Sequence, residues 1–200
     1  PKALRTIGGT LANNGTFDKR HCLALLSAFL QDTSVTRYAT WEDLLDYCQR
    51  SAAPVGRTML EIHGEWNADI EASDALCIAL QLLNHLQDVH HDALHLDRIY
   101  LPQEWLQYSS HNKDRIVHQA VIHTLNHIDL LLQQAAQLPA TLQSRRFRME
   151  IIIILEMAIQ LSRQLRCNTD SQIRVTLSST DKILCLLRSI KRFIRTSPLR

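Results

Sequence analysis

Glycine is confined to the first third of this chain. The five glycines are Gly8, Gly9, Gly15, Gly56 and Gly64, so residues 65–200 contain none. Sandwiches, barrels and doubly wound α/β folds need many tight turns, and glycine is the residue that adopts turn conformations most readily. The distribution therefore predicts an all-α fold of long helices. It also excludes the glycine-rich phosphate loops of Rossmann and P-loop proteins.

The overall composition is that of one globular domain. The chain has 200 residues, of which 46% are hydrophobic and 21% charged, and this length is enough to bury a core. Because there are no internal repeats and no Gly/Ser-rich linker, we expect a single helical domain over residues 1–200. The formal net charge of +2 is too small to indicate a nucleic-acid partner, and we expect none.

The cysteines and the apolar runs bear on where the protein resides. Cys22, Cys48, Cys77, Cys167 and Cys185 are odd in number and form no CxxC pair. This usage is typical of reduced, buried thiols in a cytoplasmic protein. The most apolar run, residues 151–155, is far shorter than the ~20 residues needed to cross a bilayer.

The spacing of apolar residues predicts the secondary structure. Thr40 and Asp43 are spaced as a capping box, and Pro54 predicts a kink in the helix that follows them. Ser73 is the expected N-cap of another helix. No convincing strand is predicted. The expected helices cover residues 2–13, 19–31, 41–63, 74–95, 112–137, 143–166 and about 180–195, with a short piece at 102–105.

The last expected helix is basic and amphipathic. Apolar Leu184, Leu187, Ile190 and Ile194 recur at helical spacing, and no acidic residue follows Asp181. Two interpretations remain open. The favoured one is a helix packed on the core with a solvated basic face, since packing is what most amphipathic helices do. The other is peripheral contact with an anionic membrane surface. The basic residues are Lys182, Arg188, Lys191, Arg192, Arg195 and Arg200.

A polar stripe runs along the helix expected at 74–95. Asn84, Asp88 and Asp92 are four residues apart, and Gln81 lies three residues before Asn84, so all four share one face. On a buried helix this stripe needs a compensating cation, and Mg²⁺ takes oxygen ligands of this kind. From the spacing alone we favour the alternative that the stripe faces water, because DxxxD pairs are common on exposed helices.

The histidines and tryptophans give weaker signals. His123 and His127 have zinc-ligand spacing, but no HExxH motif accompanies them, and we interpret them as structural. His90 and His91 are expected to point away from the acidic stripe. The three tryptophans are too far apart in sequence to predict a stacking platform; they are Trp41, Trp66 and Trp105.

Two segments together resemble the squalene/phytoene synthase family. Residues 47–57 (YCQRSAAPVGR) resemble its YC-x-x-SA-x-PVGR segment. Residues 81–92 (QLLNHLQDVHHD) and 97–102 (DRIYLP) resemble its second aspartate-rich motif and the R-x-Y-L-P continuation. The residues of both segments are most similar to those of the bacterial hydroxysqualene synthase branch of hopanoid and squalene synthesis. Further agreement lies at Phe29, Asp32, Arg37, Tyr38, Arg148-Met149-Glu150 and Arg174-Val175-x-Leu177.

The resemblance implies an all-α isoprenoid synthase fold with a deep apolar cavity and a Mg²⁺ cluster that holds an isoprenoid diphosphate substrate. In the branch named, presqualene diphosphate loses diphosphate, the carbocation rearranges, and water captures it as hydroxysqualene. The residue roles that follow are implied by the family alone. Asp88 and Asp92, together with Asn84, would hold Mg²⁺. The diphosphate would be contacted by Arg98 and Arg37, beside Tyr38. Tyr47 would face the carbocation, and Gln81 and Ser51 would be polar residues of the cavity wall.

The sequence departs from the family pattern in two places. Gln87 stands where many members that condense two prenyl diphosphates have arginine, which favours the hydroxysqualene branch over that alternative. The family's first aspartate-rich motif is absent. We therefore expect the chain to represent the C-terminal two-thirds of the domain, incomplete at its N-terminus, and to have little or no activity alone. A third alternative is a non-catalytic helical module, which should expose a large apolar patch.

Overall fold

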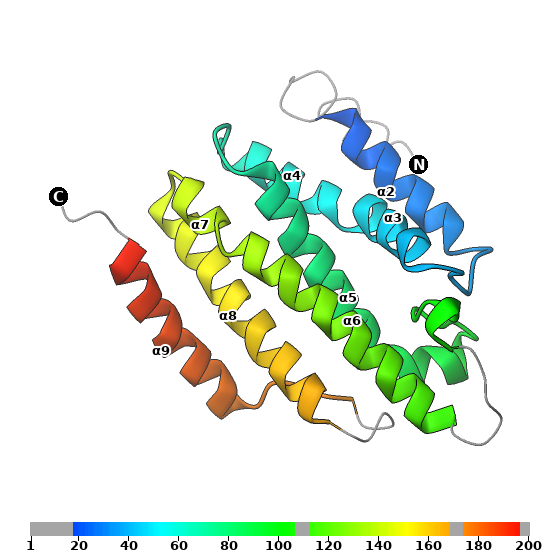
Figure 1. Ribbon diagram of the computed structural model, residues 1–200. Coiled ribbons are helices and arrows are strands. Elements are labelled where there is room, and N and C mark those ends of the chain that lie inside the picture. Colours follow the sequence, from blue (N-terminus) through cyan, green and yellow to red (C-terminus); the bar gives the residue numbers. More distant parts are fainter. Residues whose placement is uncertain (1–17, 107–112, 169–173, 197–200) are drawn as a thin grey trace.

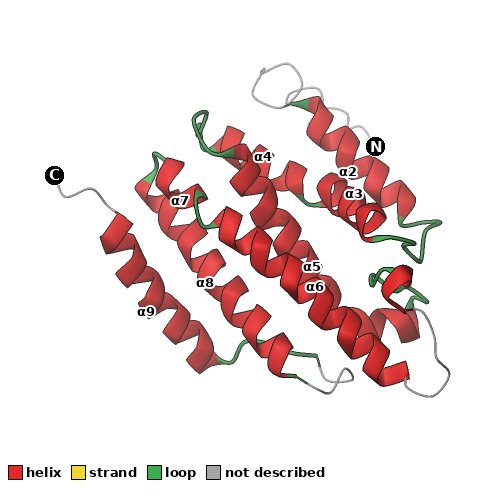
Figure 2. Cartoon of the chain, in the orientation of Figure 1, coloured by secondary structure: helices red, strands yellow, loops and turns green. Residues whose placement is uncertain are grey.

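The computed structural model describes residues 18–106, 113–168 and 174–196, and in this part of the chain helices are joined by loops, without a strand (Figures 1 and 2). The all-α prediction is confirmed. A single isolated parallel bridge joins Arg37 and Ile99. The helix expected at 2–13 lies outside the described residues. The elements are α2 (Lys19–Gln31), α3 (Trp41–Ser51), α4 (Ala53–Ile62), α5 (Ile70–His95), the 3₁₀ helix η1 (Gln103–Leu106), α6 (Lys113–Ala135), α7 (Leu138–Thr141), α8 (Arg145–Cys167) and α9 (Ser179–Thr196).

The long helix α5 is the centre of the molecule. It packs against α3, α4, α6, α7 and α8, and Figure 1 shows α6, α8 and α9 following it in turn toward one edge, with α2 at the opposite edge. Leu82 and Leu83 of α5 are buried together with Leu125 of α6 and Leu155 of α8. This packing fixes the position of the acidic stripe, because its residues lie on the same helix.

The helix expected at 41–63 is two helices. The capping box is confirmed: Asp43 N donates to Thr40 Oγ1 over 3.2 Å, and Thr40 N donates to Asp43 Oδ2 over 3.1 Å. At Ala52 the backbone leaves helical geometry, with φ −123° and ψ −47°, and a new helix starts at Ala53. Pro54 then occupies the first turn of α4, where its missing N–H costs nothing. The kink predicted at Pro54 is therefore a complete break.

The cap predicted for α5 is wrong. The helix begins at Ile70, because the Asp69 carboxylate accepts a hydrogen bond from Ala72 N over 3.0 Å. Ser73 lies one turn inside the helix and is buried. Asp and Ser are both favourable N-cap residues. The helix begins after Asp69, which comes first along the chain.

The thiol prediction holds in part. All five cysteines are free, and Cys48 and Cys185 are buried, but Cys22 and Cys167 are exposed. Both exposed residues lie near helix ends on the outside of the bundle. Among the described residues, every helix is too short or too polar to traverse a membrane.

The last helix packs in an unexpected orientation. α9 contacts α8, as favoured above, but it does so through Cys185 and Ser189, both fully buried. The four apolar residues that were expected to face the core are instead 42–67% exposed. The expectation of a buried apolar face is therefore wrong, whereas the expected solvated basic face is present, since Arg188, Lys191 and Arg195 are exposed.

Candidate functional site

The C-terminal half of α5 borders an open cleft that contains both aspartates of the stripe. The cleft has a volume of about 530 Å³. Asp88 and Asp92 are half-buried, with side chains 21% and 16% exposed. Both residues point to the same side because they are one helical turn apart. The lining residues are Gln87, Asp88, His90, His91, Asp92, Leu94, His95 and Arg174.

Arg174 binds Asp88 with two nitrogen atoms. Its Nε lies 2.7 Å from Oδ1, and its NH2 donates to Oδ2 over 3.2 Å. Gln87 holds this segment in place, since its Nε2 donates to the Val175 carbonyl oxygen over 2.5 Å. Arg174 was not among the predicted site residues. The signal that could have found it is its place in the Arg174-Val175-x-Leu177 agreement with the family.

Histidines line the cleft beside Asp92. His91 Nδ1 lies 3.3 Å from Asp92 Oδ1, and the His91 ring lies 4.6 Å from that of His95. His90 and His91 both line the cleft, so the expectation that they point away from the acids is wrong. The carbonyl oxygen of Asp92 accepts from Leu96 N and Arg98 N, each over 3.0 Å, which ends α5 directly beside the cleft.

The residues of this cleft suit a magnesium ion. Mg²⁺ binds carboxylate oxygens and usually takes one or two of them together with phosphate oxygens of a substrate. Asp88 and Asp92 offer such oxygens on one face of α5. Arg174 now neutralises Asp88, but its side chain is 57% exposed and can turn outward. Asn84 is exposed one turn before Asp88 and is not a lining residue of the cleft.

A second group of predicted residues forms a buried aromatic cluster. Tyr47 donates a hydrogen bond to Asp32 Oδ2 over 3.1 Å. Arg98 donates to the Tyr100 hydroxyl over 3.1 Å and to the Asp32 carbonyl oxygen over 2.5 Å. The rings of Tyr47 and Tyr100 lie 5.9 Å apart, and Tyr38 is within 5.8 Å of both. Burial raises the pKa of Tyr47 and of Tyr38 well above the ordinary value.

His85 lies at the base of this cluster. Its ring stacks on Tyr100 at 3.7 Å, and its Nε2 lies 3.1 Å from Gln81 Nε2. Burial lowers the pKa of His85 to about 3, with a smaller contribution from the Arg98 charge. The imidazole is therefore neutral, and its Nε2 accepts from the Gln81 amide, an assignment inferred from the hydrogen bond.

The structure thus divides the predicted residues. Asp88 and Asp92 share the open cleft, whereas Tyr38, Tyr47 and Arg98 share the buried cluster, with Gln81 at its edge. Arg37 binds the Asp97 carboxylate, with NH2 2.6 Å from Oδ1. The Ser51 hydroxyl, at the end of α3, is buried without a hydrogen-bond partner among the described residues. The roles expected for these residues toward a diphosphate or a carbocation remain predictions.

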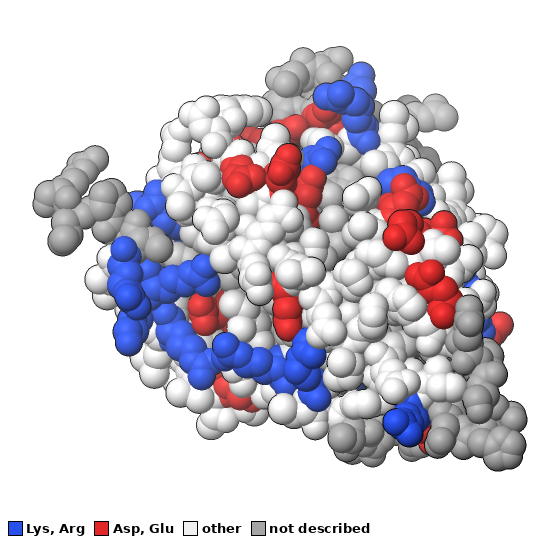
Figure 3. Space-filling view, in the orientation of Figure 1, with Lys and Arg blue, Asp and Glu red and all other residues white. Residues whose placement is uncertain are grey.

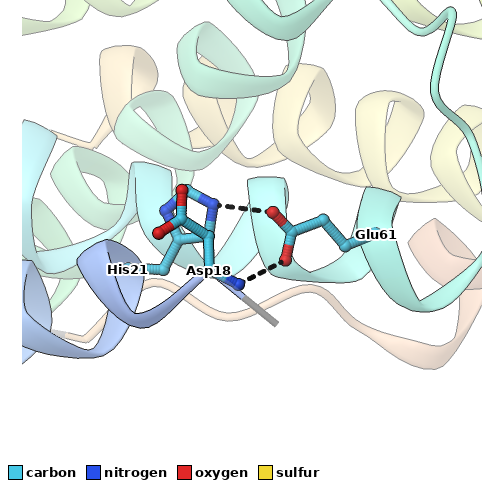
Figure 4. Close-up of side chains that lie close together, drawn as sticks. All are labelled: Asp18, His21 and Glu61. Atoms are coloured by element: carbon cyan, nitrogen blue, oxygen red, sulfur yellow. Dashed lines mark hydrogen bonds and ion pairs between the residues drawn. The ribbon is translucent and has the colours of Figure 1, made fainter. Parts of the chain in front are cut away.

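One further trio of potential ligand side chains lies near the start of α5 (Figure 4). Ligand atoms of Asp18, His21 and Glu61 all lie within 4.8 Å of one another. His21 Nε2 is 3.1 Å from Glu61 Oε1, and Asp18 N donates to Glu61 Oε2 over 3.3 Å. A hydrogen bond from Arg20 lowers the pKa of the Asp18 carboxyl to about 2. We interpret these three residues as a hydrogen-bonded contact that holds α2 against α4.

Two tryptophans that are distant in sequence meet in the structure. The rings of Trp41 and Trp105 stack at 5.6 Å, and His127 stacks on Trp41 at 4.3 Å. His123 lies 4.5 Å from Trp105. The expectation that the tryptophans form no stacking group is wrong for this pair. The two histidines on α6 are structural, as expected, because they pack on the indole rings.

Comparison with known proteins agrees with these features. The profile of the family described as "Squalene/phytoene synthase" matches residues 1–181. A hydroxysqualene synthase of Sinorhizobium fredii is 35% identical over 173 residues, which is 82% of this chain and 59% of that protein. A phytoene synthase of Pseudescherichia vulneris is 42% identical over 91 residues, 44% of this chain and 28% of that protein. The chain therefore spans about three fifths of the length of its hydroxysqualene synthase relative.

A solved structure shares the fold. Squalene synthase HpnC from Alicyclobacillus acidocaldarius superimposes with a TM-score of 0.72 at 29% sequence identity, over 84% of this chain and 66% of that one. The helical arrangement described above is thus the isoprenoid synthase fold of these proteins. The profile match, the relatives and the shared fold lead to one conclusion: this chain belongs to the squalene/phytoene synthase family.

Proposed function

We propose that this chain carries one half of the catalytic centre of an enzyme that converts presqualene diphosphate to hydroxysqualene. The observation that carries the proposal is the cleft on α5, where Asp88 and Asp92 lie on one face and Arg174 lies 2.7 Å from Asp88. The branch is proposed from the 35% identity to a hydroxysqualene synthase over most of the chain.

The reaction needs charge stabilisation where diphosphate leaves. The carbon–oxygen bond breaks with its electron pair on the diphosphate, the cyclopropylcarbinyl cation rearranges, and a water oxygen bonds to it and releases a proton. Mg²⁺ would act as a Lewis acid on the diphosphate oxygens. Asp88 and Asp92 would hold the metal, and Arg174 would turn from Asp88 to the leaving group, since a guanidinium fits phosphate oxygens well.

The buried cluster would support the hydrocarbon end of the site. The Tyr47 hydroxyl is fixed on Asp32, so its ring is held rigidly and can present a face to a cation. The neutral His85 holds the Gln81 side chain, which would leave the Gln81 amide oxygen to position a water. Arg98 would stabilise this cluster through Tyr100 and Asp32.

The test is product formation by the complete natural gene product. We expect presqualene diphosphate and Mg²⁺ to yield hydroxysqualene, measured by mass spectrometry. Asp88→Asn should lower kcat by about a hundredfold or more, as loss of one charge-stabilising group does elsewhere. Asp114→Asn, on the exposed first turn of α6, is the matched control and should leave turnover unchanged. Equal activity of both variants would contradict the role of the cleft.

The same experiment separates a second candidate, the condensation of two prenyl diphosphates. This candidate is supported by the phytoene synthase relative, which is 42% identical over 91 residues. Gln87 argues against it, because a neutral side chain that is bound to Val175 O cannot offer the cationic contact of the condensing members. Product from farnesyl diphosphate, with none from presqualene diphosphate, would establish condensation instead. A protein inert with both substrates would favour a non-catalytic helical module.

A further inference from the structure

The outward face of α9 is apolar. Ile183, Leu187, Ile190 and Ile194 are 42–67% exposed, and their spacing places them in one stripe along the helix. Successive helical residues are turned by about 100°, so this stripe lies opposite Cys185 and Ser189, the residues buried against α8. An amphipathic helix normally turns its apolar face to the core, and α9 does the reverse.

Cations border the same stripe on one side. Arg188, Lys191 and Arg195 are exposed, and with Arg192 they line a shallow cleft of about 440 Å³. Figure 3 shows Lys and Arg side chains as a continuous band along this edge of the molecule. Between Lys182 and Arg195 there is no acidic residue on the helix. Positive charge is therefore concentrated beside exposed apolar surface.

We propose that α9 docks this protein on an anionic lipid surface. The apolar stripe would enter the boundary between headgroups and acyl chains, and the cationic flank would meet the lipid phosphates. This is the charge and apolar layout of helices that lie in the membrane interface, and an anionic leaflet attracts clustered Lys and Arg. Docking is measured as binding to lipid vesicles, so the test does not depend on the proposed reaction.

Charge complementarity favours this occupant over a second copy of the chain. An antiparallel two-fold contact through the stripe would bring the same cationic flank of each copy together. Arg188, Lys191 and Arg195 of the two chains would then repel one another, because no acidic residue lies between Lys182 and Arg195 of α9 to compensate. A lipid bilayer supplies the phosphates that such a surface lacks.

The experiment is co-sedimentation of the complete natural gene product with vesicles. We expect binding to vesicles that contain phosphatidylglycerol, little binding to pure phosphatidylcholine, and loss of binding at high salt because exposed charges are screened. Neutralising Arg188, Lys191 and Arg195 to glutamine should weaken binding about fivefold per charge, on the order of a hundredfold in total. Lys19→Gln, Arg20→Gln and Arg115→Gln together, at exposed positions of α2 and α6, are the control for charge number and should have a much smaller effect.

The stripe is tested separately from the charge. Leu187→Gln with Ile194→Gln should weaken vesicle binding while leaving the melting temperature unchanged or higher, because both side chains are exposed in the free protein. Leu130→Gln, on the exposed side of α6, is the matched control and should bind as the unchanged protein does. Circular dichroism confirms that each variant is folded.

Two results would overturn the proposal. In the first, the unchanged protein does not bind vesicles and is a dimer in light scattering, whereas the stripe variants are monomers; the stripe then binds a second copy of the chain. In the second, the unchanged protein does not bind anionic vesicles and the stripe variants have a lower melting temperature; another part of the polypeptide then covers α9.

Discussion

At the scale of single residues, Tyr47 and Tyr38 form a matched pair in the buried cluster. The Tyr47 hydroxyl donates to Asp32, whereas the buried Tyr38 hydroxyl has no hydrogen-bond partner among the described residues. Tyr47→Phe leaves a carboxylate oxygen without its donor, which should lower the free energy of unfolding by about 1–3 kcal/mol. Tyr38→Phe should be neutral or slightly stabilising. Urea denaturation of both variants checks this, and equal losses would mean that the Tyr47–Asp32 bond contributes nothing.

His85 should make stability depend on acid. Its pKa in the folded protein is about 3, below the ordinary value of 6.5, so the unfolded chain binds the proton more tightly. The free energy of unfolding should therefore be highest above pH ~6.5, about 2 kcal/mol lower at pH ~5, and lower still toward pH ~3. His85→Phe keeps a ring against Tyr100 and should remove this dependence in pH-resolved denaturation. The exposed His91→Phe is the control, and an unchanged slope in His85→Phe would refute the assignment.

At the scale of the elements, Gly56 sets how closely α4 approaches α5. A Cβ at this position would lie 2.6 Å from Cys77 Sγ and 2.7 Å from Ser73 Oγ. Overpacking of this kind costs about 1–3 kcal/mol, more than the ~1 kcal/mol that alanine gains over glycine in a helix. Gly56→Ala should therefore destabilise the protein in chemical denaturation.

A background variant isolates the steric cause at Gly56. With Ser73→Ala and Cys77→Ala already present, both opposing atoms are gone, and the added Gly56→Ala should become neutral or stabilising. A persistent loss of stability in that background would mean that the close approach is not the reason for glycine here. The measurement is a double-mutant comparison of unfolding free energies.

The N-cap of α5 shows what local sequence leaves undecided. Asp69 and Ser73 are both suitable caps by residue type, and only the path of the chain between α4 and α5 placed Asp69 at the helix start. Asp69→Ala should cost about 1 kcal/mol of stability by the loss of its bond to Ala72 N. Ser73→Ala, one turn inside the helix, should not show that cost in thermal melts.

At the scale of the whole molecule, the chain leaves apolar surface uncovered at both edges. Leu23, Leu26, Phe29 and Leu30 of α2 are 55–69% exposed, and the α9 stripe lies at the opposite edge. With one carboxylate pair on α5, we expect the 200-residue chain alone to give little or no hydroxysqualene in the assay above. Turnover by this chain that is abolished by Asp88→Ala would contradict that expectation.

The sequence by itself determined the fold class, most helix positions, the Thr40–Asp43 capping box and the alignment of Asp88 with Asp92. These follow from residue type and from spacing along one helix, which local chemistry sets. Only the tertiary structure decided which residues distant in sequence meet. It brought Arg174 to Asp88, Trp105 to Trp41 and Arg98 to Asp32. It also turned the apolar face of α9 outward. The periodicity of a helix shows that one face is apolar, but only the neighbours that pack on it determine which face is buried.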